Sequence, residues 1–222
     1  MKKKQFNDWW NLEGNYKILH KINPLRIKFI LEKYGKKIEK KRILDIGCGG
    51  GLITSSLAEM NAKVTGIDED LSSIKQAKEH AKKKLLKINY INSSLDSFFK
   101  KNKKKFDLIL CLEVLEHVDN LENTLDKIAK LMSTSSILIL STINRNLKSL
   151  IFAKIFGEYI LNWIPIGTHQ FEKFIKPQEI NDLIISKKLK LKETVGMKFN
   201  PIENKWFLSK DTDINYFMVI SK

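Results

Sequence analysis

A chain of 222 residues with 43% hydrophobic residues is long enough to bury the core of one α/β domain. Two cysteines, Cys48 and Cys111, are too few for a disulfide framework and indicate a reducing compartment. The net charge of +15 would suit a nucleic-acid binder, but only three of the 40 basic residues are arginine, so we expect a solvated lysine-rich surface and no nucleic-acid partner.

The N-terminal residues 1–8 carry lysines without a following apolar run, so we expect no signal peptide. No window of 18 apolar residues exists, which argues against a spanning helix. We therefore expect a cytoplasmic protein, with a peripheral position at the inner face of the cell membrane as an alternative. A single domain over residues 1–222 is expected, with an N-terminal helical cap at about 5–40 and an inserted helical segment at about 145–176.

The N-terminal cap is predicted to be helical. The pair Asn23-Pro24 suits a helix start and is followed by apolar positions at helical spacing. Ahead of it, Trp9 and Trp10 form an aromatic pair. These two side chains have two open interpretations, which are core packing and a lid over a ligand cleft.

The stretch Arg42–Leu52 is the most informative part of the chain. A short apolar run leads into Gly47, Gly49 and Gly51, and an amphipathic run follows. This pattern predicts a strand, a tight glycine turn and a helix. Glycine allows the backbone angles of such a turn, and a ligand can then lie against the bare backbone.

Two acidic residues narrow the type of ligand. Asp45 lies inside the predicted strand, where a carboxylate is costly to bury without a partner. Asp68 ends the next apolar run, 17 residues after Gly51, and suits a carboxylate that accepts hydrogen bonds from ribose hydroxyls. No Gly-Lys-Ser/Thr closes the glycine turn. The pattern Asp-x-Gly-x-Gly-x-Gly resembles motif I of class I S-adenosylmethionine-dependent methyltransferases more than a nicotinamide fingerprint.

Strands and helices then alternate along the chain, which predicts a Rossmann-like α/β fold with a seven-stranded, mostly parallel, doubly wound sheet. The final strand is expected to be antiparallel. The expected strands are 42–47, 62–68, 88–91, 106–111, 137–141, 189–196 and 216–221. The expected helices are 51–60, 71–84, 95–101, 121–131 and 177–187.

The inserted segment has an amphipathic helix at residues 147–166 with a broad apolar face. It is too short and too charged to span a bilayer. Three interpretations remain open, which are a helix packed over the active site, a helix lying on an anionic membrane surface, and a dimer contact.

Glu113, Glu116 and His117 follow the predicted strand 106–111, at the sheet edge where doubly wound folds bind ligands. The three side chains suit a divalent metal site for Mg²⁺ or Mn²⁺, or general base catalysis by His117. A solvated helix start is the plain alternative. A base or a bound metal would favour the phenolate form of a phenol substrate, which then attacks a methyl sulfonium.

Two motifs, Asp45–Gly51 and Cys111–Val118, resemble the bifunctional O-methyltransferases of ubiquinone (coenzyme Q) biosynthesis. The resemblance extends from about residue 6 to the C-terminus, although Met132–Ser136 replaces the Pro-Gly-Gly turn that is common before strand 5 in methyltransferases. Further matching segments are Trp9–Gly14, Leu19–Arg26, Ser141–Asn146, Gly167–His169, Lys173–Pro177, Phe199–Pro201 and Asp213–Tyr216.

The resemblance implies a set of roles. Arg26 would contact the carboxylate of S-adenosylmethionine, and Leu112 would lie beside that cofactor. The cofactor site would be completed by residues of the two acidic and glycine positions described above, Asp45, Gly47, Gly49 and Asp68. Glu113, Glu116 and His117 match positions assigned to Mg²⁺ in eukaryotic relatives, and residues 147–166 match a segment implicated in lipid-surface binding.

We therefore predict an S-adenosylmethionine-dependent O-methyltransferase that acts on polyprenyl-hydroxyphenol and demethylubiquinol intermediates, with His117 and Glu116 as catalytic residues. Mg²⁺ is an additional candidate cofactor, and a ubiquinone-biosynthesis protein complex is a candidate partner. Methylation of another small phenol and a non-catalytic cofactor-binding subunit are the alternatives.

Overall fold

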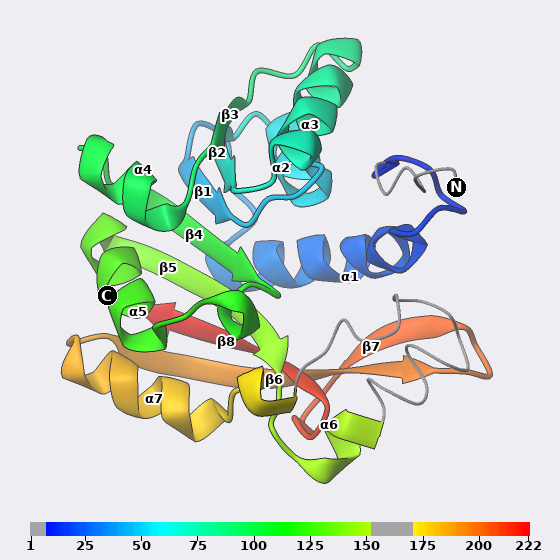
Figure 1. The fold of residues 1–222 in the computed structure, drawn as a ribbon, viewed down its shortest axis with the longest axis vertical. Helices are drawn as coiled ribbons and strands as arrows, with labels where there is room; N and C mark the ends of the chain where they lie inside the picture. Colours follow the sequence, from blue (N-terminus) through cyan, green and yellow to red (C-terminus); the bar gives the residue numbers. More distant parts are fainter. Residues whose placement is uncertain (1–7, 152–170) are drawn as a thin grey trace, which may run out of the picture.

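A computed structural model describes residues 8–151 and 171–222 of the chain. Helices and strands alternate along it as expected (Figure 1). The helices are α1 (Lys17–Tyr34), α2 (Leu52–Glu59), α3 (Leu71–Lys83), α4 (Leu95–Lys101), α5 (Leu121–Leu131), α6 (Leu147–Ile151) and α7 (Pro177–Ser186). The strands are β1 (Arg42–Ile46), β2 (Lys63–Asp68), β3 (Asn89–Asn92), β4 (Phe106–Leu112), β5 (Met132–Ile143), β6 (Lys190–Asn200), β7 (Lys205–Ser209) and β8 (Asn215–Ser221).

The described strands form one sheet in the order β3-β2-β1-β4-β5-β8-β6-β7. The first five strands in this order are parallel, and β8 is antiparallel to both neighbours, which confirms the expected antiparallel final strand. Reversal of the strand order between β1 and β4 creates a crevice at the carboxyl ends of these two strands, and such crevices bind ligands in doubly wound sheets.

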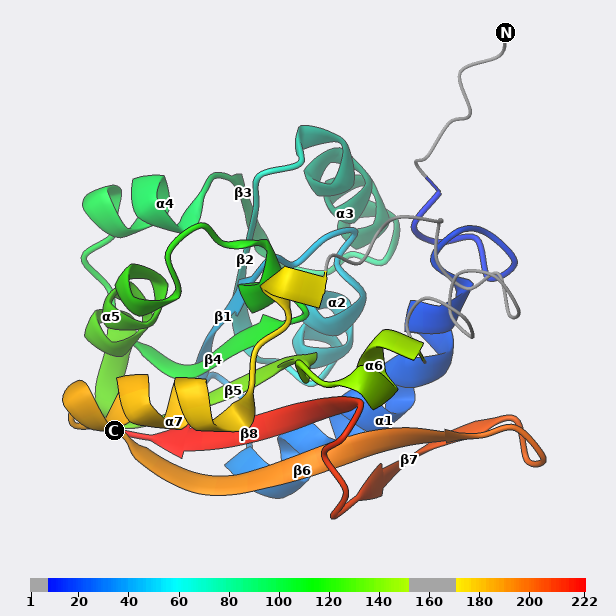
Figure 2. The same ribbon diagram turned by 60° about the horizontal axis from the view of Figure 1, so that its bottom comes forward.

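Two apolar layers enclose the sheet. On one face, α1 and α2 pack through residues such as Phe29, Ile30 and Leu57. On the other face, α5 and α7 bury Leu125, Ile128 and other aliphatic side chains. Figures 1 and 2 show these helices on opposite sides of the strands. A central parallel strand buried on both faces explains why β4 is almost entirely apolar.

Three details differ from the expectations. The described sheet has eight strands instead of seven, because Lys205–Ser209 pairs with β6 as a hairpin. Helix α1 begins at Lys17, so Pro24 lies inside the helix and does not start it. Burial of Ile18 and Ile22 stabilises the extra turns. Residues Met132–Ser136 are the start of β5, where a turn was expected.

The inserted segment is described only at its edges. Helix α6 covers the first residues of the expected helix 147–166, and the remainder, 152–170, lies outside the described residues. Within the described ranges, no helix is long and apolar enough to cross a membrane.

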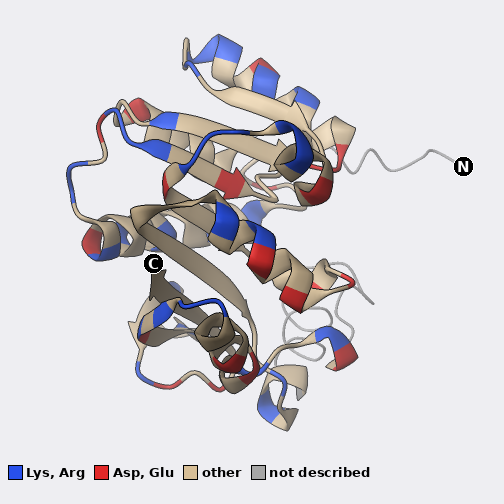
Figure 3. Ribbon diagram, turned by 90° about the vertical axis from the view of Figure 1, so that its left-hand side faces the viewer, with Lys and Arg blue, Asp and Glu red and all other residues tan. Residues whose placement is uncertain are grey.

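Basic residues are spread over several helices and loops of the face in Figure 3, with acidic residues among them. Arg42 and Lys127 pair with the carboxylates of Asp107 and Asp96, respectively. The distribution agrees with the interpretation of the lysines as a solvated surface.

Candidate functional site

The glycine turn between β1 and α2 has the geometry that its sequence predicts. Gly47, Gly49 and Gly51 have φ angles of 70°, 51° and 86°, in the left-handed region that residues with a Cβ rarely adopt. A Cβ added to Gly47 would overlap the Cγ2 atom of Val114. The backbone of the turn at Gly47 therefore packs directly against the Val114 side chain of the segment after β4.

Asp68 links the glycine turn to the end of β2. Its Oδ2 atom accepts a hydrogen bond from the backbone N–H of Gly49 at 2.8 Å, and its Oδ1 atom accepts one from Asp70 at 2.8 Å. Strands β1 and β2 are parallel neighbours, so Asp68 lies at the same sheet edge as the turn. Each carboxylate oxygen retains a second lone pair, which a ribose hydroxyl can use.

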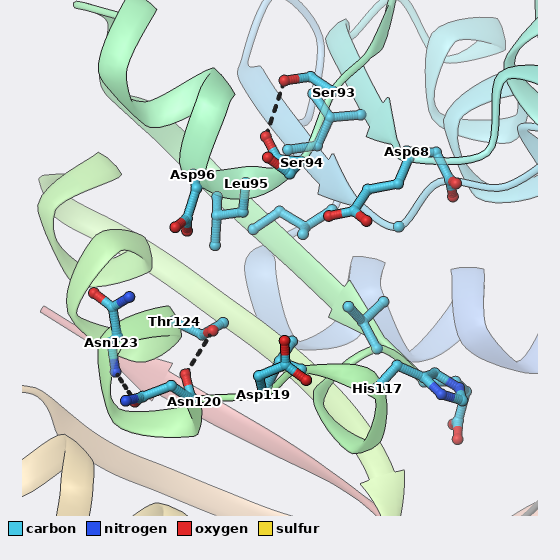
Figure 4. A pocket seen from close by; sticks show the side chains of 17 residues that line it. Asp68, Ser93, Ser94, Leu95, Asp96, His117, Asp119, Asn120, Asn123 and Thr124 are labelled. Atoms are coloured by element: carbon cyan, nitrogen blue, oxygen red, sulfur yellow. Dashed lines mark hydrogen bonds between the residues drawn. The ribbon is translucent and has the colours of Figure 1, made fainter.

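A pocket of about 580 Å³ opens at this sheet edge. It joins the glycine turn and Asp68 to the segment after β4, and His117 lies on its opposite side from Asn123 and Thr124 (Figure 4). The lining residues that were predicted as site residues are Gly47, Asp68, Glu113 and His117.

Glu113 is held in an unusual backbone conformation at the end of β4. Its φ angle is 56°, which is sparsely populated for a residue with a side chain. Its Oε1 atom accepts a hydrogen bond from Ser141 Oγ at 2.7 Å and lies 3.3 Å from the Arg26 guanidinium. Residues held in sparsely populated regions cluster at functional sites, and here the contacts to β5 and α1 hold the carboxylate in place.

Glu116 lies in the short 3-10 helix Leu115–His117 and is 5% exposed. Its Oε2 atom accepts a hydrogen bond from Thr142 Oγ1 at 2.8 Å. Burial and the neighbouring Glu113 carboxylate raise the pKa of Glu116 to about 8. The two glutamates therefore form a close carboxyl pair supported by hydroxyls of β5.

His117 is exposed and borders the pocket. No group of three or more His, Cys, Asp or Glu side chains in the described part of the chain is arranged to hold a metal ion. The structure thus brings Glu113 and Glu116 together without assembling the predicted three-residue metal set among the described residues. Glu113 is instead paired with the guanidinium of Arg26.

Three other predicted cofactor residues, Arg26, Asp45 and Leu112, are buried and are not among the residues that line the pocket. Asp45 is 3% exposed and Leu112 is 9% exposed at the ends of β1 and β4. Burial and the negative charge of Asp68 raise the pKa of Asp45 to about 8, against the opposing charge of Arg26. Arg26 is buried, and its Nε atom has no hydrogen-bond partner in the structure.

These features fit S-adenosylmethionine. The backbone of Gly47 at the pocket, the carboxylate of Asp68 and the unsatisfied Nε–H of Arg26 match a ligand with a ribose and an amino-acid carboxylate. The sequence did not point to Ser141 and Thr142 as supports of the glutamates. Two hydroxyl residues at the carboxyl end of an apolar strand were the available signal.

Comparison with known proteins agrees with this geometry. Residues 37–195 match the family described as a methyltransferase domain. Among solved structures, the plantazolicin methyltransferase BamL, crystallised with S-adenosylhomocysteine, has a TM-score of 0.72 at 18% identity, covering 92% of this chain and 86% of that chain. Magnesium protoporphyrin IX methyltransferase from Synechocystis gives a TM-score of 0.65 at 18% identity, covering 93% and 84%. These likenesses show the fold.

The similarity to curated sequences is closer. The ubiquinone biosynthesis O-methyltransferase of Rickettsia typhi is 42% identical over 97% of this chain and 88% of its own length. The protein of the same name from Pelagibacter ubique is 42% identical over 94% and 90% of the two chains. With Gly47 of the glycine turn, Asp68 and Glu113 lining one pocket, this chain belongs to the ubiquinone biosynthesis O-methyltransferase family of S-adenosylmethionine-dependent enzymes.

Proposed function

We propose that the chain transfers a methyl group from S-adenosylmethionine to a phenol oxygen of polyprenylated intermediates, both a polyprenyl-hydroxyphenol and a demethylubiquinol. One observation carries the proposal. A single pocket is lined by the glycine turn and Asp68 on one side and by Glu113 and His117 on the other. Cofactor and substrate groups can therefore meet in it, and proximity and alignment are the main means of catalysis for such a transfer.

S-adenosylmethionine, when bound, supplies a methyl group activated by a positively charged sulfur. On the cofactor side we assign binding to Gly47, Gly49 and Asp68, with Arg26 directed at the carboxylate through its unsatisfied Nε–H. We assign Asp45 and Leu112, which are buried at the ends of β1 and β4, a supporting role on the same side. One methyltransferase domain over residues 1–222 would hold all of these groups.

On the substrate side we assign His117 as the group that takes the phenol proton. It is exposed to the pocket, and an imidazole exchanges a proton near neutral pH. Glu116 is buried next to it in sequence, so we assign it a supporting role, in which it holds the 3-10 helix on Thr142. Glu113 shares this support through Ser141.

A polyprenyl substrate dissolves in the bilayer, so we also propose that residues 147–166 contact an anionic membrane surface at the inner face of the cell membrane. The start of this segment supports the idea, because Leu147 is 68% exposed and Lys148 lies next to it. Flotation with liposomes, with and without anionic lipid, tests this contact. Protein that stays at the bottom of the gradient under both conditions would contradict it.

The central test is an assay of purified protein with radiolabelled S-adenosylmethionine and three acceptors, which are a polyprenyl catechol, a demethylubiquinol and the same catechol without the prenyl tail. We expect label in both prenylated products and a much lower rate with the tail-free phenol. Absence of label from both prenylated acceptors would overturn the proposal. Equal rates with and without the tail would point to another small phenol as the substrate.

A further inference from the structure

Residues 8–16 form a folded cap over the glycine turn before α1 begins. They lie outside the residues 37–195 that match the general methyltransferase domain. Figure 2 shows this N-terminal stretch beside α1 and near α3. Two tryptophans in it, Trp9 and Trp10, make most of the contacts that join the cap to the rest of the molecule.

Trp9 docks on the turn and on α3. Its Nε1–H donates to Ser73 Oγ at 2.8 Å, and its backbone N–H donates to Gln76 Oε1 at 3.0 Å. A Cβ added to Gly49 or Gly50 would overlap atoms of the Trp9 side chain, so the tryptophan lies directly against the bare backbone. The ring also stacks on Tyr16 with a centroid separation of 3.8 Å.

Trp10 holds the same turn from a second position. Its Nε1–H donates to the carbonyl oxygen of Gly50 at 3.0 Å. The Trp10 ring stacks on His80 of α3, with centroids 3.2 Å apart and planes 1° from parallel. His20 of α1 donates to the carbonyl oxygen of Trp9 at 2.7 Å, which connects the two tryptophans to the first helix.

Neither tryptophan lines the pocket. Their contacts reach it through the turn, whose Gly47 lines the pocket and whose Gly49 N–H bonds to Asp68. Consecutive glycines lose more conformational freedom on ordering than other residues, so a turn with three positive φ angles is costly to fix. A ligand binds more tightly when this cost is met before it arrives.

We infer that Trp9 and Trp10 are positioning residues for S-adenosylmethionine, which hold the glycine turn in its binding shape through Ser73, Gly50 and His80. The inference rests on the proposed cofactor role of the turn. Under this inference the two tryptophans do more than pack against the core, because they act on cofactor binding through the glycine turn. Coupling between two sites is reciprocal, so the free energy by which the docked cap strengthens cofactor binding equals the free energy by which bound cofactor stabilises the docked cap.

The test measures binding of S-adenosylmethionine by calorimetry to full-length protein without any phenol. Ser73→Ala removes the hydrogen bond from Trp9 Nε1–H and also the bond from Ser73 Oγ to Asp70. Trp9→Phe removes the same Nε1–H bond and also the ring atoms that lie against Gly49. We expect each to raise the Kd about fivefold, and the double variant to raise it by less than the product of the two single effects, because the two changes share the Trp9–Ser73 hydrogen bond. Trp10→Phe should have a similar effect of about fivefold, through its bond to Gly50.

Trp206→Phe is the matched control, because Trp206 lies in β7 on the far edge of the sheet. It should leave the Kd unchanged even if it lowers the Tm. Kinetic assays should show a higher KM for S-adenosylmethionine in the Trp9 and Trp10 variants with an unchanged KM for the phenol. Hydrogen exchange should show that the cofactor slows exchange of the amides of residues 9–16.

A Kd that is unchanged in Trp9→Phe, Ser73→Ala and Trp10→Phe, with only the Tm lowered, would overturn the inference and leave the cap a purely structural element. Cofactor-independent exchange at residues 9–16 would overturn it as well. Wild-type protein that binds no S-adenosylmethionine would instead contradict the proposed function itself, so the two failures are distinguishable. We use these conservative changes because a larger truncation such as Trp9→Ala can prevent folding, and the binding test would then give no result.

Discussion

The two sides of the pocket are built in different ways. The proposed cofactor side consists mainly of backbone, with the glycine turn held by Asp68 and by Trp10. The proposed substrate side consists of side chains, with Glu113 and Glu116 held by hydroxyls of β5 and with Arg26 paired to Glu113. Removal of a side chain should therefore damage the two sides differently. The cofactor side should be sensitive to added atoms and the substrate side to deleted groups.

His117→Ala tests the substrate side and should have the largest effect. We expect kcat to fall at least about 100-fold, because the proton acceptor is lost. The Kd for S-adenosylmethionine should stay the same, since the glycine turn is untouched. Steady-state kinetics and calorimetry measure the two quantities. A variant with full activity would contradict the role of His117 as the base.

Gly47→Ala tests the cofactor side by adding one methyl group. The new Cβ would overlap Val114 at a φ of 70°, so the turn must shift. We expect the Kd for S-adenosylmethionine to rise about 30-fold, from strain and displacement of a few kcal/mol.

Gly35→Ala is the control for Gly47→Ala, because Gly35 also has a positive φ, 112°, but has no atom within 4 Å of an added Cβ. It should lower the Tm without changing the Kd. Equal effects of the two variants on the Kd would show that backbone strain alone, and not contact at the turn, causes the loss.

Asp45→Asn tests the buried carboxylate of β1 through the pH dependence of the free energy of unfolding. The pKa of Asp45 is raised from 3.8 to about 8, so the folded protein binds more protons than the unfolded chain between these values. The free energy of unfolding of the wild type should therefore fall relative to that of Asp45→Asn as the pH rises from about 4 to 8, and the difference should level off above that range. Denaturant unfolding at several pH values measures it. A difference that does not vary with pH would show that Asp45 titrates normally.

Removal of divalent metal should have the smallest effect. Glu113 is paired with Arg26 and the described residues assemble no three-residue metal set, so we expect EDTA to change kcat by less than about twofold. Rates measured in EDTA and across a Mg²⁺ titration test this. A strong loss in EDTA that Mg²⁺ restores would show that the two glutamates rearrange to bind a cation.

The sequence predicted the parts of the molecule that depend on local pattern. The parallel order around β1 and β4 follows from alternating apolar runs, and the turn at Gly47 follows from its glycines. Strand β7 was missed although Trp206, Phe207 and Leu208 are apolar, because its role depends on pairing with β6. The start of β5 at Met132 likewise depends on pairing with Phe106.

The candidate site was predictable in its residue types but not in its contacts. Glu113 and Glu116 were identified from their position after a buried strand. Their supports on β5, Ser141 and Thr142, lie more than 20 residues away in the chain, and no local pattern joins them. The docking of Trp9 on Ser73 has the same non-local character, so the choice between packing and a functional role could not be made from sequence.

The position of β8 has a consequence for how the protein is made. This strand comes after β5 and β6 in the chain, yet it pairs with both and separates them in the sheet. During synthesis on the ribosome, the edges of β5 and β6 that pair with β8 therefore have no partner strand until residues 215–221 have emerged. Completion of the sheet is a long-range step, so a chaperone that shields strand edges should help this chain most before residues 215–221 have emerged.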